Sequence, residues 1–197
     1  MKIDITEVTA VILAWGQGRR MGGQDKGLLE FDGKPLVATL IDKLQSQGLD
    51  IVINANRNHG AYQRFGYPLV SDKLADYQGP LAGFAAAMGS VDSTFILTLP
   101  CDGPLLASDY AQRFLDSYSS RQAPVLVAFD GDRLQPVHAM ISVDLLPSLQ
   151  GFLDEGERKI DRWYAQHDYE RVDFSDCADM FRNINTPADQ ASLQTSP

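Results

Sequence analysis

The feature that most constrains this chain is an apolar run, Val8–Ala14, that leads directly into a glycine-rich loop ending at Gly27. The loop also carries three cationic residues, Arg19, Arg20 and Lys26. Glycines let backbone N–H groups approach an anion without a Cβ in the way, and cationic side chains offset several negative charges. The pattern therefore predicts a buried strand followed by a phosphate-binding loop.

The spacing within this loop does not match three well-known phosphate-binding loops. A P-loop would need a hydroxyl residue after its lysine, but Gly27 follows Lys26. The dinucleotide fingerprint would need glycine at Met21, and no acidic residue closes a second strand about 20 residues later. The H-R-D and D-F-G elements of protein kinases are absent from the sequence. The loop is therefore of another type.

Alternation of apolar runs with helical patterns predicts an α/β fold. Runs of strand length occur at 8–14, 50–55, 67–71, 94–99, 124–129 and 137–142. Between them, apolar residues follow i, i+3, i+4, i+7 spacing over 37–44 and again over 81–88, and Gly48 ends the first of these helices. We expect one domain over residues 1–197, with a three-layer α/β/α, Rossmann-like architecture and a mostly parallel central sheet.

The charge and cysteine content narrow the classes of partner. A net charge of -9 and a pI near 4.7 argue against nucleic acid or an anionic membrane surface, because those partners require a positive footprint. Cys101 and Cys177 are too few for a disulfide framework, so we expect two free thiols. The apolar run at 9–15 is far shorter than the ~20 residues that span a bilayer. A cytoplasmic protein is the expectation.

Polar residues stand where several of the predicted strands end. The run at 8–14 ends in the glycine-rich loop, while Asn54, Asp72 and Asp102 lie at or just after the next strands. In an open parallel sheet, ligands bind at the carboxyl ends of the strands, near the point where the strand order reverses. The fold would therefore bring glycine N–H groups, an amide and two carboxylates to one rim.

Two residues at this rim have the chemistry of a nucleotide site. Asp102 follows an apolar strand and a proline, so we expect a free carboxylate at a strand tip, suited to Mg²⁺. The alternative is a cap for a helix that begins around Ala107, although Ser108 is better suited to that role. Lys26 would provide a point charge for phosphates, because the glycines around it, Gly27 among them, hold it on a tight loop.

A nucleotide whose phosphates carry Mg²⁺ can be attacked at its α-phosphorus without a protein nucleophile. Catalysis then consists mainly of alignment and of neutralising the charge on the departing pyrophosphate. His59, His138 and His167 show no metal-ligand spacing, and the sequence has no convincing Ser-His-Asp or Cys-His pattern. If the acceptor is itself a phosphate, no general base is required either.

The loop resembles the signature L-A-G-G-x-x-x-R-M-G-G-x-D-K-G of the molybdenum cofactor guanylyltransferases, which are nucleotidylyltransferases. Further pieces similar to that family extend from about Val8 to Asp189. They are G-K-P-L at 33–36, V-I-N-A-N-R at 52–57, D-x-L-A-D-Y-x-G-P-L-A-G at 72–83, P-C-D at 100–102, G-E-R at 156–158 and N-I-N-T-P at 183–187.

The resemblance implies a donor, an acceptor and a set of site residues. GMP would pass from GTP to the terminal phosphate of molybdopterin carrying molybdenum, with Mg²⁺ as cofactor, giving the guanine dinucleotide cofactor and pyrophosphate. The part at about 1–105 would bind GTP and the part at about 106–190 molybdopterin. Catalysis would rest on Lys26, Arg20 and Asp102, with Asp102 on the metal. The other binding residues would be Leu13, Ala14, Trp15, Gly16, Arg19, Gly22, Gly23, Asn54, Asp72 and Gly79 for the nucleotide, and Arg158 or Lys159, Asn183 and Asn185 for the pterin.

One position departs from the family pattern, and two rival functions stay open. Trp15 stands where the first glycine of the G-G pair is expected, so its indole could stack on the purine or block it. The nearest rival is a cytidylyltransferase of the same cofactor or a sugar-phosphate nucleotidylyltransferase. Another is an inactive GTP-binding regulator that carries the cofactor. The family also implies partners among cofactor-biosynthesis or molybdoenzyme-maturation proteins.

Overall fold

A computed structural model describes residues 2–14, 23–72 and 79–194 of the chain. Its centre is a seven-stranded sheet with the strand order β5-β4-β1-β6-β8-β7-β9. The strands are β1 (Val8–Ala14), β4 (Asp50–Ala55), β5 (Leu69–Val70), β6 (Phe95–Pro100), β7 (Val125–Phe129), β8 (Leu134–Ser142) and β9 (Tyr169–Asp173). Strand β8 pairs antiparallel with β6 and β7, and the other neighbouring pairs are parallel. The prediction of a mostly parallel sheet is confirmed.

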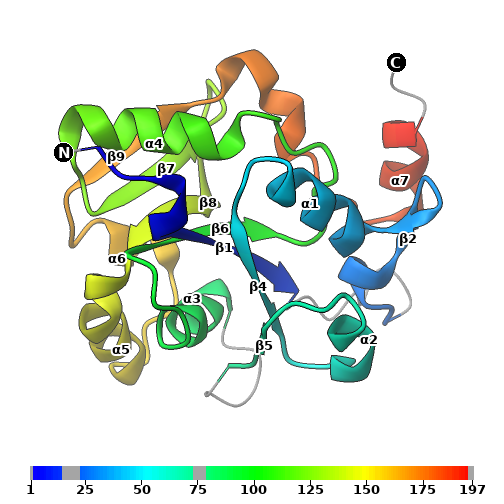
Figure 1. Cartoon of the computed structure of the whole chain (residues 1–197), viewed down its shortest axis with the longest axis horizontal. Coiled ribbons are helices and arrows are strands. Elements are labelled where there is room, and N and C mark those ends of the chain that lie inside the picture. The colour runs from blue at the N-terminus through cyan, green and yellow to red at the C-terminus, as the bar shows by residue number, and fades with distance from the viewer. Residues whose placement is uncertain (1, 15–22, 73–78, 195–197) are drawn as a thin grey trace.

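Helices cover both faces of this sheet (Figure 1). Apolar residues of α1 (Leu36–Gln45) and α4 (Tyr110–Arg121) pack in one cluster with alternate residues of β1, such as Ile12. The opposite face of β1 packs with α3 (Pro80–Met88), α5 (Leu146–Asp154) and α6 (Ile160–Tyr164). Strand β1 is buried along its whole length because it lies between two strands and two helical layers. This arrangement confirms the three-layer α/β/α architecture.

The remaining elements are short. They comprise the 3₁₀ helices η1 (Ile5–Glu7), η3 (Lys26–Leu28), η4 (Val143–Leu145) and η5 (Ser175–Phe181), the hairpin of β2 (Glu30–Phe31) and β3 (Lys34–Pro35), and the helices α2 (His59–Gln63) and α7 (Pro187–Gln194). The same sheet takes strands from both the predicted nucleotide part and the predicted pterin part, since β6 pairs with β8. The single domain and its functional division stay predictions.

Several elements differ from the sequence-based expectations. Strand β9 has no counterpart in them, because its five residues expose most of their side chains and only Val172 is buried. Strand β5 is shorter than the predicted run at 67–71, and β8 begins at Leu134 rather than at 137. Helix α4 begins at Tyr110, and Asp109 at its N-cap makes no side-chain capping bond, so the expected cap at Ser108 is wrong. Edge strands and polar termini lack the apolar periodicity on which such predictions depend.

A small apolar cluster brings the C-terminal helix to the N-terminal part of the chain. Phe31 of the hairpin and Leu36 of α1 pack with Ile184 and with Leu193 of α7. Figure 1 shows α7 beside the β2–β3 hairpin, although the two are far apart in sequence. The cluster fixes the segment at 183–185 close to the residues that follow the glycine-rich loop.

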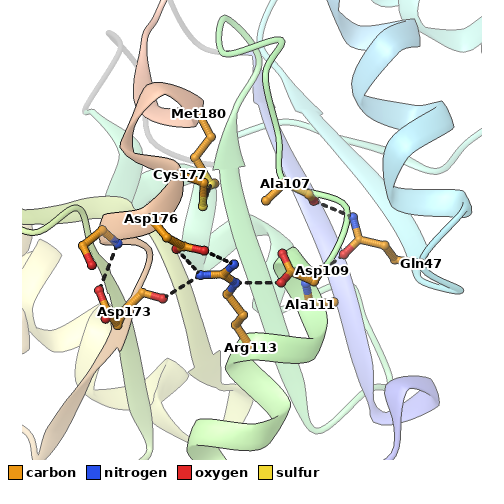
Figure 2. A network of polar contacts seen from close by, with 10 residues as sticks. Gln47, Ala107, Asp109, Ala111, Arg113, Asp173, Asp176, Cys177 and Met180 are labelled. Carbon is orange, nitrogen blue, oxygen red and sulfur yellow. Dashed lines mark hydrogen bonds and ion pairs between the residues drawn. The ribbon is translucent and has the colours of Figure 1, made fainter.

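A polar network attaches the segment after β9 to helix α4 (Figure 2). Nη1 and Nη2 of Arg113 donate to the two carboxylate oxygens of Asp176 at 2.6 and 2.8 Å, and Nε donates to Asp109 at 2.9 Å. The guanidinium also lies over the ring of Phe174, 5.0 Å from its centroid. The hydrogen bonds from Arg113 hold the pKa of Asp176 down at about 2. The network holds η5 against the N-terminal end of α4. It therefore orients η5, which leads into residues 183–185.

Two expectations about the bulk properties can be compared with the structure. Cys101 and Cys177 are both free thiols, as predicted. Among the residues that the structure describes, no helix is long and apolar enough to cross a membrane.

Candidate active site

The strand ends form one rim, as predicted. Leu13 of β1 lies in register with Asn54 of β4 and Pro100 of β6, and Asn54 lies in register with Val70 of β5. These four residues therefore form one row across the carboxyl ends of four parallel strands. The polar residues that follow the row, among them Asp72 and Asp102, start from the same edge of the sheet, where ligands bind in open α/β sheets.

At the centre of this rim, the ammonium group of Lys26 joins three distant parts of the chain. Nζ donates to Oδ2 of Asp102 at 2.7 Å and to Oδ1 of Asn185 at 2.5 Å. Lys26 lies near the end of the glycine-rich loop, Asp102 follows β6, and Asn185 precedes α7. The side chains of Lys26 and Asp102 are 16% and 12% exposed, so the pair is largely shielded from water but open to a ligand.

The prediction that the carboxylate of Asp102 is free is wrong, because the carboxylate forms an ion pair. The residue does stand at a strand tip, but its carboxylate is paired with Lys26. A buried carboxylate without a counter-ion is costly, and the ion pair removes part of that cost when no ligand is present. Sequence reasoning assigned both residues to one site, but their contact depends on how the loop returns to the sheet.

The backbone around Asp102 is tied to the C-terminal segment. The N–H of Ile184 donates to the carbonyl of Asp102 at 2.8 Å. Gly103 leaves room for Asn183, since a Cβ there would lie 3.2 Å from its Oδ1. That oxygen of Asn183 is buried and accepts no hydrogen bond from the described residues. The predicted pterin residues Asn183 and Asn185 thus lie directly beside Asp102.

Asp25 organises the end of the glycine-rich loop, a role that sequence reasoning missed. Its buried carboxylate accepts from the hydroxyl of Tyr62 at 2.6 Å and from Nδ2 of Asn58 at 3.0 Å. Burial raises the pKa of Tyr62, which keeps this hydroxyl protonated as a donor. Arg57 lies 3.6 Å from Asp25 and donates to the carbonyls of Gly23 and Gln24, each at 3.1 Å. These contacts place Lys26, the next residue, at the rim.

A second polar group, partly buried, surrounds Asp72. Nδ2 of Asn54 donates to Oδ1 of Asp72 at 2.9 Å, and Nδ2 of Asn56 donates to Oδ2 at 2.7 Å. The N–H of Asp72 donates in turn to Oδ1 of Asn56 at 2.9 Å. Both carboxylate oxygens therefore accept from amides, one in β4 (Asn54) and one just after it (Asn56). The part of Asn56 in this arrangement was not predicted, although the motif V-I-N-A-N-R contains it.

Burial disfavours the charged forms of the Cys101 thiol and the His138 imidazole. Burial, chiefly, raises the pKa of the Cys101 thiol well above its usual range, so the group stays protonated beside Asp102. Burial lowers the pKa of His138 to about 3, and its Nδ1 lies 3.2 Å from the hydroxyl of Tyr110 in the core. These properties agree with a reaction that uses no protein nucleophile.

Comparison with known proteins decides between the classes of nucleotide-binding enzyme. The model of the MobA-like NTP transferase domain matches residues 10–172. Molybdenum cofactor guanylyltransferase of Shewanella halifaxensis is 46% identical over 95% of this chain and 94% of the relative, and that of Shewanella loihica is 47% identical over 95% of each. The chain belongs to the molybdenum cofactor guanylyltransferases.

The solved structure of molybdopterin-guanine dinucleotide biosynthesis protein A from Archaeoglobus fulgidus has the same fold. It superposes with a TM-score of 0.79 over 95% of this chain and 96% of that one, at 21% sequence identity. At this identity the likeness concerns the fold. Together with the relatives, it confirms the nucleotidyltransferase fold and the guanylyltransferase family that the sequence motifs indicated.

Of the other residues predicted for a guanylyltransferase site, some lie at the rim, one caps a helix and five lie outside the described residues. Leu13 and Ala14 are buried at the end of β1, while Gly23 and Gly79 have positive φ angles of 80° and 83°, which glycine adopts without strain. Arg158 donates to the carbonyls of Leu153 and Glu157, so it caps the end of α5. Five predicted residues, Trp15, Gly16, Arg19, Arg20 and Gly22, lie outside the described residues. The binding roles of all these residues stay predictions.

Helix α3 approaches the rim closely at Gly83, where the nucleotide residues are predicted. A Cβ at this position would lie 2.6 Å from Oδ1 of Asn54 and 2.9 Å from Cδ2 of Leu13. We therefore expect Gly83→Ala to displace Asn54, to destabilise the fold by roughly 1–3 kcal/mol and to weaken GTP binding. Chemical unfolding and calorimetric titration with GTP measure the two effects.

Gly151 of α5 provides the matched control for that substitution. It is an exposed helical glycine, and no atom of the residues in the described ranges lies within 4 Å of an added Cβ. Gly151→Ala should stabilise the protein by about 0.5–1 kcal/mol, because alanine restricts the unfolded chain and favours helix, and should leave GTP binding unchanged. Equal effects of the two substitutions would contradict the close approach at Gly83.

Proposed function

We propose that this guanylyltransferase transfers GMP from GTP to the terminal phosphate of molybdopterin through the rim around Lys26, Asp102 and Asn185. The activity follows from the family, and the assignment of the reaction to this rim rests on one observation. A cationic group from the glycine-rich loop, a carboxylate at a strand tip and an amide from the predicted pterin segment meet at one point. Donor and acceptor phosphates would both reach this point.

The residues at this point fit a hard divalent cation. Oxygens of Asp102 and Asn185 already converge on one positive charge, the ammonium of Lys26, and oxygen ligands suit Mg²⁺. The described residues contain no group of three or more His, Cys, Asp or Glu side chains that could hold a metal by themselves. We infer that Asp102 holds Mg²⁺ together with nucleotide phosphates and water, a common arrangement for this ion. When bound, the ion would neutralise charge on the transferring and leaving phosphates.

The proposed reaction is a displacement at the α-phosphorus of GTP. An oxygen of the acceptor phosphate forms the new P–O bond, and the bond to the bridging oxygen of the β-phosphate breaks to release pyrophosphate. No proton has to be transferred, because the attacking oxygen is already anionic. Lys26 would move from Asp102 to the phosphates, where its charge lowers the repulsion between the two anions.

Asp72 is the proposed reader of the guanine base. Guanine offers N1–H and N2–H donors, and a carboxylate has about four lone-pair sites, more than Asn54 and Asn56 fill. Asp72 is half-buried at the end of β5 and so accessible to a ligand. On the acceptor side, Asn183 would offer the pterin a buried oxygen that has no hydrogen-bond partner among the described residues. The family also supports a further part of the proposal, that the protein interacts with other cofactor-biosynthesis or molybdoenzyme-maturation proteins.

Titration with GTP, CTP and ATP in the presence of Mg²⁺ tests the proposed function. Calorimetry should show binding of GTP at least tenfold tighter than that of CTP or ATP, because a base that leaves the polar groups of the site unpaired binds much more weakly. Equal or tighter binding of CTP would favour the cytidylyltransferase. Pyrophosphate release with molybdopterin separates an enzyme from an inactive GTP-binding carrier, which would bind GTP and release none.

A further inference from the structure

We propose that Asn56 is a positioning residue that sets the selectivity for guanine by fixing the carboxylate of Asp72. This inference rests on the proposed function, in which Asp72 reads the base. Asn56 itself is assigned no contact with the nucleotide. Its effect would pass entirely through Asp72.

Within the part of the chain that the structure describes, the side-chain hydrogen bonds of Asn56 are all made with Asp72. Its Nδ2 donates to Oδ2 of Asp72 at 2.7 Å, and its Oδ1 accepts from the backbone N–H of Asp72 at 2.9 Å. The two bonds close a ring that holds both the main chain and the side chain of Asp72. Without such contacts the carboxylate of an aspartate can rotate about its side-chain bonds. The two hydrogen bonds fix the plane of the Asp72 carboxylate relative to β4.

Asn54 completes the arrangement from the buried side. It is fully buried, and its Nδ2 donates to the other carboxylate oxygen of Asp72. The backbone of Gly83 in α3 lies so close to the Asn54 side chain that an added Cβ would be 2.6 Å from its Oδ1, so this amide has little room to move. With each oxygen of Asp72 held by a separate amide, the remaining lone pairs point in fixed directions. Fixed acceptors distinguish a base with two adjacent N–H donors from one with fewer, because a misplaced carboxylate loses both bonds at once.

The test compares GTP with ITP, whose hypoxanthine base lacks the 2-amino group of guanine. Affinities for both are measured by calorimetry with Mg²⁺ for the unmodified protein and for Asn56→Ala. We expect Asn56→Ala to weaken GTP binding about tenfold and ITP binding much less, since hydrogen bonds to a charged group are the strong ones. The preference for GTP over ITP should then fall by nearly the same factor.

A double-mutant cycle with Asp72→Asn identifies the route of the effect. If Asn56 acts through Asp72, then Asn56→Ala should change the GTP/ITP ratio little further in the Asp72→Asn background. Ser71→Ala is the matched control, because the Ser71 hydroxyl donates to the carbonyl of Ala55 at the same strand end and does not touch the carboxylate. It should leave the ratio unchanged. Asn56→Ser removes the amide donor but keeps a small polar side chain, and it serves if the alanine variant does not fold, with the same loss of preference expected.

Two results would overturn the inference. One is an unchanged GTP/ITP ratio in folded Asn56 variants, and the other is full additivity with Asp72→Asn. Failure of the proposed function gives a different result, because the unmodified protein would then show no preference for GTP over CTP and ATP. Selective GTP binding with an unaltered GTP/ITP ratio in the Asn56 variants, together with a lowered ratio in Asp72→Asn, would reject only the role of Asn56.

Discussion

Asp102→Asn should lower the rate of GMP transfer by about a thousandfold or more. The substitution keeps the shape of the side chain but removes the charge that pairs with Lys26 and that we assign to the metal. An amide oxygen is a weaker ligand for Mg²⁺ than a carboxylate, so the negative charge that develops on pyrophosphate would be poorly neutralised. Pyrophosphate release at saturating GTP and molybdopterin measures the effect.

Asp42→Asn is the control for this loss of activity. Asp42 accepts from Lys34 at 2.8 Å, a distance close to that of the Lys26–Asp102 pair, but both side chains are more than half exposed. An exposed ion pair contributes little to stability, so the control should remain folded and fully active. Thermal unfolding of both variants shows whether Asp102→Asn is folded. A folded Asp102→Asn protein with unchanged pyrophosphate release would refute the metal assignment.

Lys26→Gln should have opposite effects on catalysis and on metal binding. The transfer rate should fall about a hundredfold or more, because the phosphates lose a point charge at the centre of the rim. In the absence of nucleotide, however, the affinity for Mn²⁺, used as a probe, should rise several-fold. In the ligand-free protein, the ammonium of Lys26 forms an ion pair with the Asp102 carboxylate and so competes with any second cation that binds there.

The increase in metal affinity distinguishes this competition from simple loss of a binding group. Titration of the nucleotide-free protein with Mn²⁺ by calorimetry measures it, and Lys34→Gln at the exposed pair should leave both the rate and the affinity unaltered. Weaker or unchanged Mn²⁺ binding in Lys26→Gln would mean that the ion pair does not guard the metal site. If the prediction holds, arrival of the nucleotide moves Lys26 to the phosphates and opens Asp102 in the same event.

The polar residues at the strand ends were predictable because topology follows from pattern. An apolar run that ends in glycines or carboxylates places those groups at the carboxyl edge of a parallel sheet. Asn54, Asp72 and Asp102 were found in this way, and they do lie along one rim. The supporting residues were harder to find. Asp25 and Asn56 sit in the same motifs, but their roles depend on contacts with Tyr62 and Asp72 across gaps of 37 and 16 residues.

By itself, the sequence determined the layered α/β fold, the family and the residues that gather at the rim. Each of these follows from local periodicity or from a motif read along the chain. The tertiary structure alone decided that Lys26 occupies the carboxylate of Asp102 and shares Asn185 from the C-terminal segment. The tertiary structure alone also showed that the polar segment 169–173 is an edge strand, β9, paired with β7, because this segment has no apolar pattern in the sequence. The physical reason is the same in both cases, because hydrogen bonds and ion pairs between distant segments depend on packing that no local pattern records.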